Sequence, residues 1–228
     1  RDEYTTRHSV NVCVLMLAFG VQLGFERAEL ERMAFGALLQ DIGKMRMPDE
    51  ILNKPDDLTA EDWAIVRRHP EDGYEIVSGM GHVPRETLEI IRLHHERLDG
   101  SGYPLGLQGG QIPLHARIAG LLDTYDAMTS PRSFQDAMPA DRVLQQLYND
   151  ADRTFGQTPV QQFIRCVGVY PVGSLVELDN GAAGVVLGSR PDARIQPTVL
   201  MVRTPDGDFY EKRMLLNLAA DAEAGGPA

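Results

Sequence analysis

The chain is poor in cysteine, in positive charge and in long hydrophobic runs, and each shortage excludes a class of protein. Cys13 and Cys166 are the only cysteines among 228 residues, so no disulfide framework can form and a reducing compartment is favoured. The 22 basic residues face 33 acidic ones, and the formal charge of −11 disfavours binding to a nucleic-acid polymer or an anionic membrane. Residues 12–20 form one of the longest apolar stretches and are too few to cross a bilayer. We therefore expect a cytoplasmic protein that makes no membrane contact through this segment.

The spacing of apolar residues predicts helices up to about residue 167. One stripe with helical spacing is expected to face a core and consists of Leu30, Met33, Ala34, Ala37, Leu38 and Asp41. A similar stripe on an earlier helix consists of Val10, Val14, Leu17 and Val21. Another helix should begin at Thr59, where Asp62 completes a capping-box pattern, and one more should follow Pro84. The apolar spacing in residues 116–128, 143–148 and 160–167 predicts three further helices.

The pattern changes after Tyr170. Short apolar runs follow one another, and Asp179-Asn180-Gly181 between two of them is a turn signal. This texture predicts a small antiparallel sheet over roughly residues 170–217.

The fold class is therefore mainly α, a helical bundle followed by a small antiparallel β appendix. We expect the boundary to separate residues 1–167 from residues 168–228, and the tail from Asp221 onward to be disordered. Because the first residue is Arg1, we also expect the segment to be a fragment, and the sequence upstream of it could hold a signal, a receiver or another module.

Acidic residues at apolar positions point to a metal site. Asp41 occupies a core position of its helix stripe, and a buried carboxylate costs several kcal/mol unless it is paired or bound to a metal. Asp123 and Asp126 share one face of a largely apolar helix. Carboxylates and imidazoles that point inward from several helices are typical of metal sites in helical bundles.

Simpler interpretations of the same residues stay open. Asp41 could pair with Lys44 one turn later, and a single buried histidine is more often a satisfied core residue than a ligand. Adjacent His94 and His95 diverge by about 100° on a helix and need not share a site. Two other histidines lack an acidic or imidazole neighbour in a fitting register and are expected at the surface: His82 and His115.

A far more specific pattern covers residues 94–132. It reads HHERLDGSGYPLGLQGGQIPLHARIAGLLDTYDAMTSPR and closely resembles the HD-GYP family, a branch of the HD phosphohydrolase superfamily, at nearly every fixed position. Further elements of the family pattern follow in the expected order, namely YTTRHS around His8, LLQDIGK around Asp41 and RRHPEDG around His69. The resemblance extends over about residues 4–165, and the segment after it looks like the small β extension of many relatives.

The resemblance implies a phosphodiesterase that opens cyclic di-GMP to linear pGpG or to GMP in bacterial second-messenger signalling. It also implies two divalent metal ions, iron or manganese, which suit mixed imidazole and carboxylate ligands. Carried over position by position, the first metal would be held by His8, Asp41 and Asp123. The second metal would be held by His69, His94 and His95, and Asp41 would bridge the two.

The same resemblance assigns roles around the metals. Lys44 and Asp126 would be catalytic: Lys44 hydrogen-bonds the phosphate or the nucleophile, and Asp126 orients a neighbour or accepts a proton. Arg132 would hold a phosphate through its fork geometry. The substrate-side loop would consist of Gly102, Tyr103 and Pro104.

Four positions depart from the family pattern. Gln40 stands where the family carries the histidine of its name, and an amide oxygen is a weaker ligand, so only one metal could remain. Tyr4 stands where three-metal relatives carry glutamate, so no third metal is expected. Gln135 replaces a basic residue that contacts phosphate, and Pro131 replaces a common aspartate.

These departures leave three hypotheses. The first is a working cyclic di-GMP phosphodiesterase that tolerates Gln40. The second is a degenerate domain with little catalysis that binds cyclic di-GMP, or a signalling protein docked on the GYP loop, as a regulator. The third is a phosphohydrolase with another substrate, since a fold does not fix its ligand. A homodimer formed through flanking helices would be compatible with each.

Overall fold

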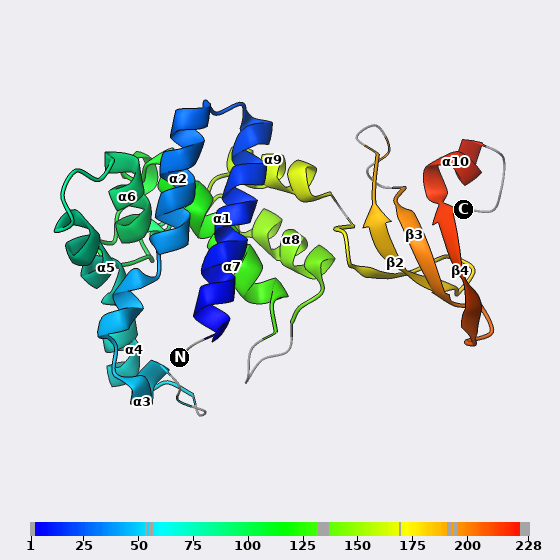
Figure 1. Cartoon of the computed structure of the whole chain (residues 1–228), viewed down its shortest axis with the longest axis horizontal. Coiled ribbons are helices and arrows are strands. Elements are labelled where there is room, and N and C mark those ends of the chain that lie inside the picture. The colour runs from blue at the N-terminus through cyan, green and yellow to red at the C-terminus, as the bar shows by residue number, and fades with distance from the viewer. Residues whose placement is uncertain are drawn as a thin grey trace. The chain divides into compact units, whose positions relative to one another are not determined.

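The computed structural model describes residues 3–52, 54, 57–131, 137–168, 170–190, 193 and 196–223. The chain divides into two compact units (Figure 1). The first comprises Arg1–Met138 and Gln145–Cys166, and the second comprises Pro139–Leu144 and Val167–Ala228. In the described residues, helices dominate the first unit and a sheet dominates the second, so the mainly α fold with a β appendix is confirmed.

In the helical unit, helices contact both their neighbours in the sequence and helices far from them in the sequence. Its elements are α1 (Glu3–Leu23), α2 (Arg27–Leu39), η1 (Ile42–Arg46), α3 (Asp49–Leu52), α4 (Ala60–Val66), α5 (His69–Ser78), α6 (Arg85–Leu93), η2 (Gly109–Gln111), α7 (Leu114–Thr129) and α9 (Gln157–Val167). Helix α8 (Ala140–Asn149) is divided between the two units. The pairs α1–α2, α2–α6, α6–α7 and α1–α7 are in contact, which makes α1, α2, α6 and α7 a closed bundle.

Helix α1 buries a different face from the one that the sequence pattern predicts. Its core residues are Val12, Met16 and Phe19, all fully buried. The expected stripe is exposed instead and consists of Val10, Val14, Leu17 and Val21. The prediction was wrong because α1 is apolar on both faces, so the spacing of one apolar set could not identify the side that packs.

Helix α2 also departs from its predicted stripe. Met33, Ala34 and Ala37 are buried as expected, but Leu38 is partly exposed. The helix ends at Leu39, and Asp41 follows it as the residue before η1. Asp41 is nevertheless buried, which satisfies the expectation of an inward-facing carboxylate.

The remaining sequence signals of helix boundaries are mostly confirmed. Thr59 accepts a hydrogen bond from the Asp62 amide, and the Asp62 carboxylate accepts one from the Thr59 amide, which forms the predicted capping box. The helix that this box opens ends at Val66, and a new helix begins at His69 with a proline in its first turn. Pro84 directly precedes α6, as expected.

The β unit is a four-stranded antiparallel sheet with strand order β1-β2-β3-β4. Its strands are β1 (Leu175–Glu177), β2 (Ala183–Gly188), β3 (Thr198–Arg203) and β4 (Phe209–Asn217). A small core of its own forms around Ala182, Val199 and Met201. The predicted turn at Asp179–Gly181 joins β1 to β2.

The chain after the sheet forms α10 (Leu218–Glu223). The expected disorder from Asp221 is therefore wrong for residues 221–223, and residues 224–228 lie outside the described part. Among the described residues, no helix combines the length and the apolar character that a membrane span requires.

Candidate metal centre

The residues that the sequence singles out for metal binding meet inside the helical unit. His8 lies on α1, Asp41 follows α2, and His69 is the first residue of α5. His94 directly follows α6, and Asp123 lies in the middle of α7. All five are buried, so helices far apart in the sequence place imidazoles and carboxylates in one interior region.

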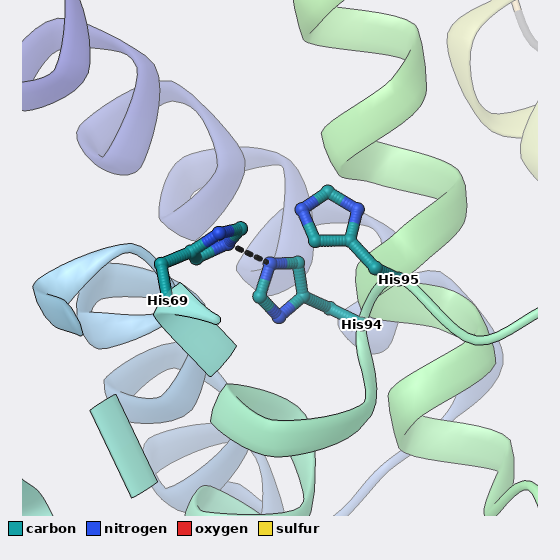
Figure 2. Close-up of side chains that lie close together, drawn as sticks. All are labelled: His69, His94 and His95. Atoms are coloured by element: carbon teal, nitrogen blue, oxygen red, sulfur yellow. Dashed lines mark hydrogen bonds between the residues drawn. The ribbon is translucent and has the colours of Figure 1, made fainter. Parts of the chain in front are cut away.

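Three histidines form the centre of this region. One ring nitrogen from each of His69, His94 and His95 lies within 4.8 Å of the others (Figure 2). The rings of His94 and His95 have centroids 4.1 Å apart. His94 and His95 therefore share one site, although neighbouring positions of a helix need not. Helix α6 ends at Leu93, and both histidines lie in the turn that follows it.

Backbone carbonyls fix which ring nitrogen faces the centre in His69 and His94. Nδ1 of His69 donates to the carbonyl of Val66 at 2.7 Å, and Nδ1 of His94 donates to the carbonyl of Ile91 at 3.0 Å. In the neutral rings, the Nε2 atoms therefore carry lone pairs, and they lie 3.4 Å apart. Two facing lone pairs repel each other, and a cation that binds both would remove this repulsion.

The surroundings keep these imidazoles neutral. Burial lowers the pKa of His69 to about 4, although Asp41 acts in the opposite direction. Burial also lowers the pKa of His94, and burial together with the neighbouring histidines lowers that of His95 well below its usual value. Neutral imidazoles are the form that binds metals, so the cluster is prepared for a cation at neutral pH.

Asp41 supplies a carboxylate to the same cluster. Its Oδ1 lies 3.3 Å from Nε2 of His69, and its Oδ2 accepts a hydrogen bond from Nζ of Lys44 at 2.8 Å. Burial by itself would raise the pKa of Asp41, but the Lys44 ammonium and the nearby histidines hold it far below its usual value. The pairing of Asp41 with Lys44, which the sequence left open, therefore coexists with the metal-site arrangement.

A second group of residues lies on the other side of Asp41. His8 bridges two carboxylates, with Nε2 2.8 Å from Asp123 and Nδ1 2.6 Å from Asp126. Burial disfavours the charged ring, but the hydrogen bonds to Asp123 and Asp126 raise the pKa of His8 to about 10. Asn11 donates to the second oxygen of Asp126 at 3.0 Å, a contact that the sequence did not reveal.

Gln40 is fully buried beside this second group. Its Nε2 donates to Oδ1 of Asp123 at 2.8 Å, the same oxygen that His8 contacts. Its Oε1 is buried without a hydrogen-bond partner among the described residues. A buried acceptor with no partner costs about 1–3 kcal/mol, and a cation would satisfy it.

The two groups fit a metal to different degrees. His69, His94, His95 and Asp41 present three neutral imidazoles and one ionised carboxylate, a complete ligand set for a divalent transition metal. The group around His8 offers two carboxylates, an amide oxygen and a histidine that is protonated in this arrangement. Binding a metal there requires the His8 proton to leave, so the first group is the stronger site.

The GYP loop packs directly against the histidines. The ring of Tyr103 stacks on His95 with centroids 4.6 Å apart. A Cβ on Gly102 would lie 2.4 Å from the amide nitrogen of Arg97, so this position requires glycine to keep the loop against the turn after His95. Glu96 is the main residue that sequence reasoning missed here, because its buried carboxylate accepts hydrogen bonds from the Leu105 and Leu107 amides, at 2.7 and 2.9 Å.

Other predictions have mixed outcomes. His82 is exposed as expected, but His115 is half-buried and lies 2.8 Å from Glu89, so the expectation that it has no acidic neighbour was wrong. Two positions on which the phosphate prediction depends lie outside the described residues: Arg132 and Gln135. Arg67, which the sequence did not single out, lies with its guanidinium 5.6 Å from the ring centroid of Tyr103.

A helical bundle with buried histidines and aspartates from several helices defines a class of metal-binding helical domains. A family model described as an HD domain matches residues 1–158. The chain belongs to the HD domain family, in its HD-GYP branch.

Curated relatives carry names of phosphodiesterases. The chain is 40% identical over 198 residues to a cyclic di-GMP phosphodiesterase of Pseudomonas aeruginosa, a match that covers 87% of this chain and 48% of the relative. It is 34% identical to a 3′3′-cGAMP-specific phosphodiesterase of Vibrio cholerae, over 68% of this chain and 30% of the relative. The chain thus spans about half the length of these relatives or less.

Solved structures support the fold. Bd1817 of Bdellovibrio bacteriovorus aligns with a TM-score of 0.59 and 24% identity, covering 71% of this chain and 52% of that chain. The HD domain of the phosphodiesterase PgpH of Listeria monocytogenes, in complex with cyclic di-AMP, aligns with a TM-score of 0.52 and 20% identity, covering 71% and 87%.

Proposed function

We propose that this protein is a metal-dependent phosphodiesterase that hydrolyses cyclic di-GMP to linear pGpG or GMP in bacterial second-messenger signalling. The observation that carries the proposal is the His69–His94–His95 cluster beside Asp41, with Lys44 at its edge. The names of the relatives point to a cyclic dinucleotide as the substrate class. We also propose that residues 1–167 are the catalytic domain and residues 168–228 a separate extension.

The metal would be held by His69, His94, His95 and Asp41, and a second one by His8, Asp41 and Asp123 with the Gln40 oxygen as a weak ligand. We propose one or two ions of iron or manganese, because these metals accept mixed imidazole and carboxylate ligands. A bound divalent ion supplies activation of water and polarisation of the phosphate.

The residues of the chain itself position the substrate and the protons. The Lys44 ammonium is partly exposed and lies 2.8 Å from Asp41, where it can donate to a phosphate oxygen. Both carboxylate oxygens of Asp126 are engaged by His8 and Asn11, so we assign Asp126 to orienting His8 rather than to accepting a proton. Tyr103 provides an aromatic face beside His95.

A dianionic substrate needs local positive charge, because the whole chain carries −11. Lys44 and the metal supply it at the centre, and the family resemblance adds Arg132. Arg67 beside Tyr103 is a further cation at the substrate-side loop. Together with Gly102 and Pro104, these groups would make the phosphate-binding side of the site.

The binding-only alternative is not favoured. The stronger ligand group is complete, and Gln40 donates its hydrogen bond to Asp123 of the weaker group. Docking of signalling proteins on the GYP loop, homodimer formation and a cytoplasmic location remain predictions of the sequence.

The proposal is tested by hydrolysis of cyclic di-GMP with protein that has been stripped by a chelator and reloaded with manganese. Wild type should release pGpG or GMP, and Asp41→Asn should reduce the rate by about 10²-fold or more, since it weakens the metal site and the Lys44 contact. Asp152→Asn, which changes an exposed carboxylate outside the cluster, is the matched control and should keep the wild-type rate. A reloaded wild type that releases no product contradicts the proposal.

A further inference from the structure

A cavity of about 390 Å³ adjoins the candidate metal centre within the helical unit. Asp41 and Lys44 form part of its lining, and the rest comes from α1, the end of α2, η1 and the segment up to Leu52. Its volume lies within the range of small-molecule sites, about 300–1,000 Å³. The cavity is therefore continuous with the place where Lys44 would contact a phosphate.

The wall of this cavity is mostly apolar. Val10 from α1, Leu38 from α2 and Met45 from η1 meet there, and all three are exposed large side chains. Three exposed apolar side chains from three elements that converge on one cavity contribute little to the core. Such an arrangement is typical of a surface that a ligand covers.

Polar groups accompany the apolar wall. Thr5, Thr6 and Ser9 bring hydroxyl groups from one end of α1, and Asp49 brings a carboxylate from the first turn of α3. A hydroxyl can both donate and accept a hydrogen bond, and an ionised carboxylate only accepts. An apolar wall with donors and acceptors beside it matches a nucleobase, which has apolar faces and a polar edge.

We propose that this cavity binds one guanine base of the cyclic dinucleotide while the neighbouring phosphate lies at Asp41 and Lys44. The inference rests on the proposed function. In a cyclic dinucleotide a single ribose separates each base from a phosphate, so a base attached next to a phosphate at Lys44 is within reach of this cavity. The cavity would thereby select a substrate with a base over a simple phosphodiester.

The test fills the cavity from an exposed position. Val10→Trp places a large side chain at the cavity wall, and Val14→Trp is the matched control one turn further along α1, outside the cavity lining. The two valines are 47% and 58% exposed, so neither substitution disturbs the core. Calorimetry with the metal-loaded protein measures the dissociation constant for cyclic di-GMP. It should rise about tenfold or more in Val10→Trp and stay within about twofold of the wild-type value in Val14→Trp.

Hydrolysis of bis(p-nitrophenyl) phosphate, a phosphodiester without a base, separates the inference from the proposed function. The ratio of kcat/KM for cyclic di-GMP to that for this diester should fall about tenfold or more in Val10→Trp and stay at the wild-type value in Val14→Trp.

The other outcomes separate the base-binding cavity from the proposed phosphodiesterase activity. Wild-type affinity in Val10→Trp, equal weakening by both variants, or a wild type that binds no cyclic di-GMP would overturn the inference. Weaker binding by Val10→Trp alone, in a protein that hydrolyses neither diester, would support the base site and refute the proposed phosphodiesterase.

Discussion

Restoring a histidine at position 40 tests whether Gln40 weakens metal binding at the group around His8. Gln40 is fully buried, contacts Asp123 through Nε2, and leaves Oε1 without a partner among the described residues. An imidazole is similar in size and offers a nitrogen lone pair where the amide offers a weak oxygen ligand. Gln40→His should therefore strengthen the weaker of the two metal positions.

The magnitude follows from two contributions. The substitution removes an unsatisfied buried oxygen, which should stabilise the metal-free fold by about 1–3 kcal/mol. The new imidazole nitrogen is the part that acts on metal binding. Changes around metal ligands alter metal affinity by about 10–100-fold. We expect metal content to rise toward two ions per chain, and cyclic di-GMP hydrolysis to rise by roughly tenfold.

The assay combines elemental analysis with initial rates at a fixed manganese concentration. Gln40→Leu is the matched control, because it removes the unsatisfied oxygen without adding a ligand and should raise neither quantity. If Gln40→His changes neither metal content nor rate, the reasoning that places position 40 at a metal site is refuted.

Three further predictions concern pH, packing and charge. In the metal-free protein, the pKa of His69 is about 4 when folded and 6.5 when unfolded. The unfolded chain therefore binds a proton that the folded chain does not, and the free energy of unfolding should fall by up to about 3 kcal/mol as pH falls from 6.5 to 4. His8 has its pKa raised to about 10, so its stabilisation should be complete below 6.5 and be lost as pH rises to 10. Thermal unfolding of wild type, His69→Gln and His8→Gln between pH 4 and pH 10 checks both signs, and a pH dependence that neither substitution changes would contradict them. Gly43→Ala would place a Cβ 1.9 Å from the His69 carbonyl oxygen and should destabilise the protein by about 2 kcal/mol or more in urea unfolding, whereas Gly110→Ala, which meets no atom within 4 Å, should be nearly neutral; equal effects would contradict the packing argument. Arg67→Ala should raise KM for cyclic di-GMP by about 5–10-fold with little change in kcat, and an unchanged KM in low salt would remove Arg67 from the substrate site.

Local signals in the sequence predicted local structure well. The Thr59–Asp62 capping box needs only residues three positions apart, and it is present as expected. The sheet of the second unit was also predicted correctly, because the alternation of apolar and polar residues and the turn at Asn180 are short-range features of the sequence. The metal cluster was predicted by family resemblance, and spacing alone would have left it open.

Features that depend on tertiary packing were not predictable in the same way. Both faces of α1 are apolar, so Val14 could be assigned to the core although Met16 occupies it. The joint use of His94 and His95 depends on where α6 ends, which a helical wheel cannot show. Glu96 acts through backbone amides of a loop nine and eleven residues away, and no periodic pattern reveals such a contact.

The metal content of protein purified without chelator, measured together with cyclic di-GMP hydrolysis, tests the central claim most directly. The claim predicts at least one iron or manganese ion per chain in wild type, loss of that ion in His69→Ala, and loss of product formation with it. A wild-type protein that holds no metal, or that releases product at an undiminished rate after the ion has been removed, would contradict the claim.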